Sequence, residues 1–226
     1  MNIHKAHNIS FAFHYQHIKV VGLAASIALC FILAGCGTTA KTALDQKTDN
    51  AKNTITLTGN PDIDAQFTEA LAMIKSGDLN TAEALLSNLT LSQAQLAGPH
   101  ANLGIIYYKK GQYEKAESTF RTVLEIAPDH TIAYNYLGMT LRQLGRFKEA
   151  QQSYKNAIAA NPAYPHAHLN LGILYDLYMR KPADALIHYE QYQALSASEN
   201  KKVRLWIKDL KRQTQATENK SKEDAT

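Results

Sequence analysis

Between residues 61 and 212, apolar residues recur at the three- and four-residue spacing that is typical of amphipathic helices, and glycine or proline interrupts them at short intervals. Residues 97–130 show the pattern most clearly, because Leu103 and Tyr107 fall on one predicted helix and Phe120 falls on the next. The sequence therefore predicts two short helices joined by a tight turn. Such a pair carries apolar side chains on more than one face, so it needs neighbours above and below to bury them.

The helix pair recurs at a step of 34 residues. Gly138 lies one step after Gly104, and Pro162 lies one step after Pro128. Glycine inside a helix costs about 1 kcal/mol relative to alanine, a cost that is reasonable if a neighbouring helix approaches too closely for a side chain. The step predicts four helix pairs and one further helix, at about residues 63–96, 97–130, 131–164, 165–198 and 199–212.

The fourth pair departs from the others in its turn. Tyr175 lies ten residues before Ala185, whereas the equivalent separation in residues 97–130 is nine. The turn glycine is absent, and Pro182 falls near the first position of the second helix, where proline is tolerated. We therefore expect the turn of this pair to be one residue longer.

The succession of L-G-x-x-Y, A-x-x-x-F and P within residues 97–130 resembles the tetratricopeptide repeat. The resemblance implies an all-α fold, a right-handed solenoid of about four helix-turn-helix repeats. We expect the helix at 199–212 to cap it, because Val203 and Trp206 belong to an apolar face that lies opposite lysine and arginine residues. A basic amphipathic helix lying on an anionic membrane is the alternative for this segment. Residues 213–226 are polar and are expected to be disordered.

The N-terminal segment has the pattern of a targeting signal rather than that of a folded domain. Residues 1–19 are polar with two lysines, residues 20–33 are apolar apart from one serine, and the run ends in Leu-Ala-Gly-Cys at Cys36. The apolar run is short for a membrane span, which needs roughly 20 residues. This order of regions is that of a secretory signal peptide over residues 1–35, and an uncleaved N-terminal anchor is the alternative.

The L-A-G-C ending resembles the lipobox of bacterial lipoproteins. The resemblance implies cleavage before Cys36 and acylation of that cysteine by chains such as palmitate. Gly37 stands where an aspartate would imply retention at the inner membrane, so the resemblance implies the inner leaflet of the outer membrane, facing the periplasm. Residues 36–60 have few large apolar side chains, and we expect them to tether the helical domain at 61–212 flexibly to this anchor.

Composition and charge exclude several classes of function. Lys5 and Lys19 would leave with the signal peptide, reducing the formal net charge from +4 to +2, and the remaining basic residues are dispersed, so we expect no nucleic-acid partner. Cys30 would leave as well, so the mature chain has no disulfide and no cysteine-based metal site. The sequence lacks the metalloprotease, nucleophile-elbow and phosphate-loop motifs. We expect no enzyme, cofactor, metal or small-molecule substrate.

Histidines and tyrosines do not form a predicted chemical site. His166 and His168 are two residues apart, so on a helix they point in different directions. His100 and His188 stand alone in the sequence. Most tyrosines fall at repeat positions between helices, so we expect them, like the histidines, to have packing or surface roles.

The resemblance places function on the concave face, which the first helix of each pair lines. Transferring the positions that commonly face this groove in tetratricopeptide repeats gives nine residues: Ile105, Tyr108, Lys109, Asn135, Met139, Arg142, Leu169, Ile173 and Asp176. An apolar floor with a few polar groups suits an extended peptide or an amphipathic helix of another protein. The alternative is that these side chains pack on one another or are covered by the protein's own tail. Ile132, Tyr136 and His166 occupy the positions of the basic residues in the family's chaperone-binding carboxylate clamp, so a chaperone-tail adaptor is disfavoured.

The combination of lipobox and repeats resembles several envelope assembly factors. These are pilotins of pilus secretins, the accessory lipoprotein of the outer-membrane barrel machinery, and lipoproteins associated with TonB-type systems. The resemblance implies a protein-binding scaffold for the assembly of an envelope machine. An adaptor that recruits a peptidoglycan hydrolase or a protease is the alternative, and no residue separates the two.

Overall fold

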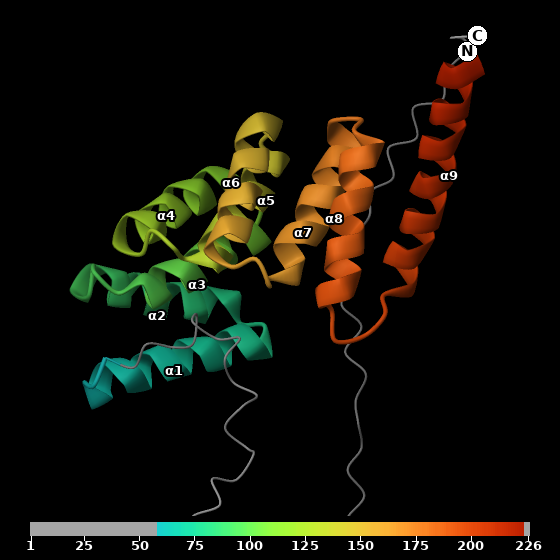
Figure 1. The fold of residues 1–226 in the computed structure, drawn as a ribbon. Coiled ribbons are helices and arrows are strands. Elements are labelled where there is room, and N and C mark those ends of the chain that lie inside the picture. Colours follow the sequence, from blue (N-terminus) through green and yellow to red (C-terminus); the bar gives the residue numbers. More distant parts are fainter. Residues whose placement is uncertain (1–57, 224–226) are drawn as a thin grey trace, which may run out of the picture. The chain divides into compact units, whose positions relative to one another are not determined.

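The computed structural model describes residues 58–223, with side chains described to residue 216. The expected signal peptide, Cys36 and the tether up to residue 57 lie outside this range. The described chain is all-helical and runs as successive helix pairs (Figure 1). Its elements are α1 (Pro61–Ser76), α2 (Leu79–Ser92), α3 (Ala97–Lys109), α4 (Tyr113–Ile126), α5 (Thr131–Gln143), α6 (Phe147–Ala160), α7 (Pro165–Ile173), the π-helical η1 (Leu174–Tyr178), α8 (Pro182–Leu195) and α9 (Lys201–Glu223).

Each helix packs against the next one along the chain, and the first helices of successive pairs also touch, α3 with α5 and α5 with α7. This contact pattern is that of a solenoid, in which each repeat meets only its neighbours. The buried side chains form two clusters that follow the same order. One lies among α1, α2 and α3 around Phe67 and Leu86, and the other extends from Ala101 to Leu210.

The glycines inside the first helices are sites of close approach, as predicted. A Cβ atom on Gly138 would lie 2.6 Å from two ring carbons of Tyr154, which is on the second helix of the same pair. Gly104 faces Phe120 and Gly172 faces Tyr189 in the same way. The repeated glycine therefore makes room for an aromatic ring of the partner helix.

The first three turns each contain a glycine in the left-handed region, such as Gly111 with φ +72°, where other residues are strained. The fourth turn differs more than the sequence predicts. Its extra residue is taken up within the helix, as the π-helical η1, and Arg180 adopts a φ of 53° where the other pairs have glycine. Pro182 begins α8, as predicted.

The last helix packs on α8 through the face that the sequence predicts to be apolar. Val203 and Leu210 are buried in the second core cluster, and the Trp206 ring lies 5.2 Å from the Tyr189 ring. The helix continues to Glu223, beyond the predicted end near residue 212. Residues 213–223 are rich in Gln, Glu and Lys, which have high helix propensity, and this accounts for the longer helix.

Candidate functional site

The nine predicted groove residues differ widely in exposure. Asn135 is only 2% exposed and Lys109 is exposed, whereas the other seven are half-buried. Five of these seven pack directly against the second core cluster: Ile105, Tyr108, Met139, Leu169 and Ile173. These five side chains therefore contribute to the core, and the alternative of mutual packing describes part of their contacts.

The polar groove residues of neighbouring repeats join across α5 and α7. Asn170 donates a hydrogen bond from Nδ2 to Oδ1 of Asn135 at 2.9 Å, and the Asn135 Nδ2 contacts the Met139 sulfur at 3.7 Å. A buried amide needs such partners, because an unpaired polar group costs free energy away from water. Asn135 is thus an internal link between repeats rather than a group free to meet a ligand.

Aromatic rings form a second link, between α3 and α5. The Tyr108 ring lies 5.8 Å from the ring of Tyr136 and 5.7 Å from that of Tyr113, and Tyr136 stacks on Phe120 at 5.7 Å. Burial raises the pKa of Tyr136. The Tyr136 hydroxyl is therefore neutral at physiological pH, and the rings provide an apolar floor with polar edges.

Arg142 and Asp176 occupy equivalent positions in adjacent repeats but do not form an ion pair. Asp176 instead accepts a hydrogen bond from the Tyr189 hydroxyl at 3.3 Å, and burial raises its pKa. Arg142 lies over the Tyr178 ring, with its guanidinium carbon 5.8 Å from the ring centroid. Its Nε and Nη1 are buried without a hydrogen-bond partner among the described residues.

Sequence reasoning missed the two residues that follow Asp176. Leu177 and Tyr178 lie on η1 and are 62% and 44% exposed. The Tyr178 ring also contacts Phe147 at the start of α6, 5.0 Å away. The equivalent positions of Leu177 one and two repeats earlier, Gln143 and Lys109, are also exposed, so the position of Leu177 within the repeat was the available sequence signal.

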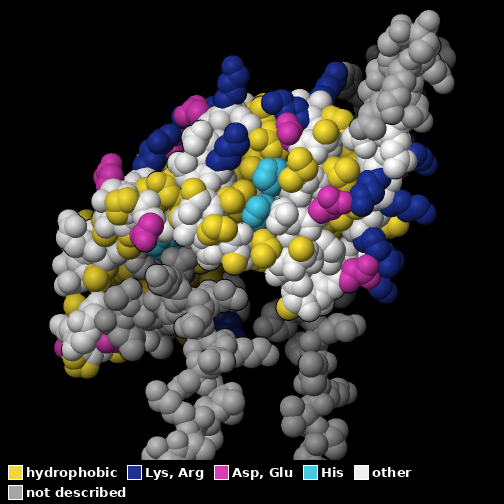
Figure 2. All heavy atoms as spheres, in the orientation of Figure 1, with side chains coloured by type: hydrophobic (Ala, Val, Ile, Leu, Met, Phe, Trp, Pro, Cys, Tyr) yellow, Lys and Arg dark blue, Asp and Glu magenta, His cyan; other side chains and the backbone are white. Residues whose placement is uncertain are grey.

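The structure also brings together two histidines that are separate in the sequence. Nδ1 of His168 and Nδ1 of His188 are 3.2 Å apart, and the His188 ring stacks on Tyr175. Burial, and next the neighbouring His168, lower the pKa of His188 to about 4. Figure 2 shows histidine side chains within an apolar surround on the face it draws. His188 is therefore uncharged at neutral pH, and the two rings pack against each other, which agrees with the packing role predicted for the histidines.

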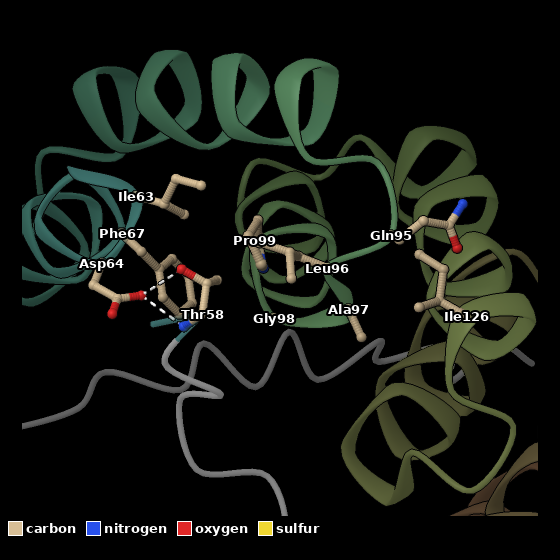
Figure 3. Close-up of a pocket in the computed structure, with 10 residues that line it drawn as sticks. All are labelled: Thr58, Ile63, Asp64, Phe67, Gln95, Leu96, Ala97, Gly98, Pro99 and Ile126. Carbon is tan, nitrogen blue, oxygen red and sulfur yellow. Dashed lines mark hydrogen bonds between the residues drawn. The ribbon is translucent and has the colours of Figure 1, made fainter. Parts of the chain in front are cut away.

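Two cavities lie outside the groove. The first, about 180 Å³, is bounded by Phe67, Leu96 and Ile126, and its carboxylate, Asp64, accepts hydrogen bonds from the Thr58 amide and hydroxyl (Figure 3). The second, about 440 Å³, lies among α4, α5 and α6. The first cavity therefore has a single titratable group, already paired, rather than the convergent set that catalysis needs.

Within residues 58–223, no cluster of three or more histidine, cysteine, aspartate or glutamate residues could hold a metal ion. In the same range, every helix is too short or too polar to cross a membrane.

Comparisons with known proteins agree with this geometry. Residues 92–163 and 137–200 match two tetratricopeptide repeat family models. The helix pairs within these ranges, from α3 to α8, are therefore tetratricopeptide repeats, and the fold resembles a tetratricopeptide solenoid, a fold typical of non-catalytic protein-interaction proteins.

Solved structures of similar fold come from several bacteria. PilF of Pseudomonas aeruginosa is 24% identical over 68% of this chain and 69% of its own, with a TM-score of 0.61. MamA of Desulfovibrio magneticus RS-1 is 19% identical over 74% of this chain and 93% of its own, with a TM-score of 0.60. The thermophilic protein TTC0263 of Thermus thermophilus is 22% identical over 66% of this chain and 81% of its own, with a TM-score of 0.57. At these identities the likeness concerns the fold.

Proposed function

We propose that this protein is a lipid-anchored scaffold of the bacterial envelope that binds a peptide or helix of a partner protein in the tetratricopeptide groove. The observation that carries the proposal is the surface at the end of the groove. There the exposed Leu177 and Tyr178 follow one another on η1, and the Tyr178 ring lies against Arg142, whose buried donors lack partners among the described residues. An exposed apolar pair beside an unpaired charge is typical of an interaction site.

The lipid anchor and the envelope location rest on the sequence. The Leu-Ala-Gly-Cys ending at Cys36 supports acylation there, and Gly37 supports the outer membrane. Three acyl chains would make release negligible, because each buried methylene contributes about 0.8 kcal/mol. The function that follows is to hold the repeats near the membrane, where they aid assembly of an envelope machine such as a pilus, outer-membrane or TonB-type complex.

The binding function is tested by crosslinking and affinity capture from intact envelopes. The wild type is compared with an Arg142→Met variant and with a matched control, Lys148→Met, which removes one exposed positive charge from α6. The proposal expects one envelope complex to be lost only from Arg142→Met, while circular dichroism shows both variants helical. Recovery of the same proteins by all three would reject the groove as the binding site.

The anchor is tested separately by a Cys36→Ser variant. We expect the wild type to take up labelled palmitate and to sediment with outer membranes, and the variant to do neither. Equal sedimentation of the two proteins would show that the anchor is not the cysteine. If the captured partner is a peptidoglycan hydrolase or a protease, the recruiting-adaptor alternative replaces the assembly scaffold.

A further inference from the structure

Arg142 lies in the last turn of α5 among aromatic side chains. The Tyr178 ring covers one side of the guanidinium. The Arg142 charge also opposes the rise that burial causes in the pKa of Tyr154 and of Tyr189. The charge is therefore near enough to affect both of these hydroxyls, and the Tyr178 ring on η1 is in direct contact with the guanidinium.

The polar groups at this point are not satisfied by the described chain. Nε and Nη1 of Arg142 are buried without a partner, and so is the hydroxyl of Tyr154. Nη2 has no hydrogen bond among the described residues either but is not buried, so it is open to solvent. Buried charged donors are nearly always paired in folded proteins. Three unpaired buried atoms in one place therefore indicate a site that is completed by something else.

The described carboxylates nearest in the groove do not complete it. Asp176 accepts a hydrogen bond from the Tyr189 hydroxyl. Among the described side chains, Arg142 takes part in no ion pair. A planar guanidinium matches a carboxylate, which can accept two parallel N–H bonds. Stacking on Tyr178 occupies one face of the Arg142 guanidinium, and Nη2 is its donor that is not buried.

We propose that Arg142 is the carboxylate-binding point of the groove and takes an aspartate or glutamate side chain from an otherwise apolar segment of the partner. Rotation about the terminal side-chain torsions would bring Nη1 to the exposed side beside Nη2, so that both donate to the partner's carboxylate. The apolar flank of the partner segment packs on Leu177 and Tyr178, which are exposed beside the charge. This inference rests on the proposed function and adds the chemical class of the partner segment.

The source of the carboxylate follows from the surroundings. A chain terminus would need several donors around both of its oxygens, and the side-chain amide of Asn135, which lies one turn before Met139 on the same helix as Arg142, is committed to Asn170 and Met139. The site has a single cationic side chain with apolar neighbours on η1, which suits one acidic side chain within an apolar stretch. The chain's own C-terminal residues, with Glu218, Glu223 and Asp224, are the competing source.

The test uses fluorescence anisotropy with the purified full-length protein in detergent. The probe is a labelled, amidated nonapeptide rich in alanine and leucine with one central glutamate. The first comparison peptide carries glutamine at that position, and the second carries glutamine and a free C-terminal carboxylate. We expect the glutamate peptide to bind about tenfold to a hundredfold more tightly than either, which is the effect of a hydrogen-bonded charge pair. Arg142→Met should abolish the difference, Arg142→Lys should reduce it, and Lys148→Met should preserve it.

Three outcomes would overturn the inference. Equal binding of the glutamate and glutamine amides would mean that no carboxylate is recognised, although the groove could still bind its partner in the envelope capture. Tight binding of the free-carboxylate peptide would assign the site to a chain terminus. A large gain in glutamate-peptide affinity on deleting residues 217–226 would show that the protein's own tail occupies Arg142.

Discussion

Three aromatic residues at equivalent repeat positions allow the unpaired hydroxyl to be tested directly. Phe120, Tyr154 and Tyr189 each pack against the close-approach glycine of their own repeat, and each is essentially fully buried. They differ at the ring tip. Phe120 has no hydroxyl, Tyr189 donates its hydroxyl to Asp176, and the Tyr154 hydroxyl has no partner among the described residues. Removing the hydroxyl should therefore have opposite effects at the two tyrosines.

The magnitudes follow from the cost of leaving a polar group unpaired. A buried donor or acceptor without a partner costs about 1–3 kcal/mol, and a hydrogen bond to a charged group contributes about 1.5–3 kcal/mol. The Tyr189 bond is long at 3.3 Å, so its contribution belongs at or below the low end. We expect Tyr154→Phe to stabilise the fold by about 1 kcal/mol and Tyr189→Phe to destabilise it by about 1 kcal/mol.

The assay is urea unfolding of residues 58–226, followed by circular dichroism, with thermal unfolding beside it. A change of about 1 kcal/mol shifts the melting temperature of a domain of this size by about 2–4 °C, so the two variants should separate by about 4–8 °C. Unchanged m-values would show that the denatured state is unaffected. Destabilisation of Tyr154→Phe by as much as Tyr189→Phe would refute the reasoning, because the hydroxyl would then be satisfied in the folded protein.

Three further predictions concern packing, backbone strain and pH. Gly138→Ala should destabilise the protein by up to about 2 kcal/mol in urea unfolding, because overpacking against Tyr154 costs about 1–3 kcal/mol and the gain in helix propensity returns about 1 kcal/mol. A stabilised variant would contradict the close approach. Arg180→Gly should stabilise by about 0.5–1 kcal/mol, because its positive φ suits glycine, and a raised unfolding midpoint is the check. His188 has a folded-state pKa of about 4, below its ordinary 6.5, so the folded state binds fewer protons between these values and stability should fall as pH falls through that window. The free energy of unfolding, measured from about pH 7 to about pH 4.5, should fall with pH in the wild type and fall less steeply in a His188→Asn variant. Identical slopes would show that His188 is not the group responsible.

The repeat pattern was enough to predict the helix pairs, and the structure explains why. The 34-residue step fixes which side chains meet, so Gly138 could be recognised as a close-approach site without knowing its partner ring. The fourth turn shows the limit of this reasoning. An extra residue between Tyr175 and Ala185 can lengthen a loop or widen a helix, and local sequence does not decide between the two. The packing of η1 against α8 decides it.

The groove residues stay a prediction from position within the repeat, and position does not predict what their side chains contact. Arg142 and Asp176 occupy equivalent positions, yet Asp176 accepts a hydrogen bond from Tyr189 while two Arg142 donors have no partner among the described residues. Whether a charge is paired depends on side chains from three other elements, and single-helix periodicity carries no information about these. The same holds for His168 and His188, which are twenty residues apart and meet only because α7 packs on α8.

The most direct test of the central claim is site-specific photocrosslinking in living cells. A photoreactive residue replaces Leu177, which is exposed on η1, or Leu91, which is 83% exposed on α2, a helix that carries none of the predicted groove residues. We expect the residue at Leu177 to capture one envelope protein, through a segment with an acidic residue, and Arg142→Met to remove this crosslink. Leu91 should not capture the same protein. Identical crosslinks from both positions, or a Leu177 crosslink that is indifferent to Arg142, would contradict the claim that the groove binds the partner.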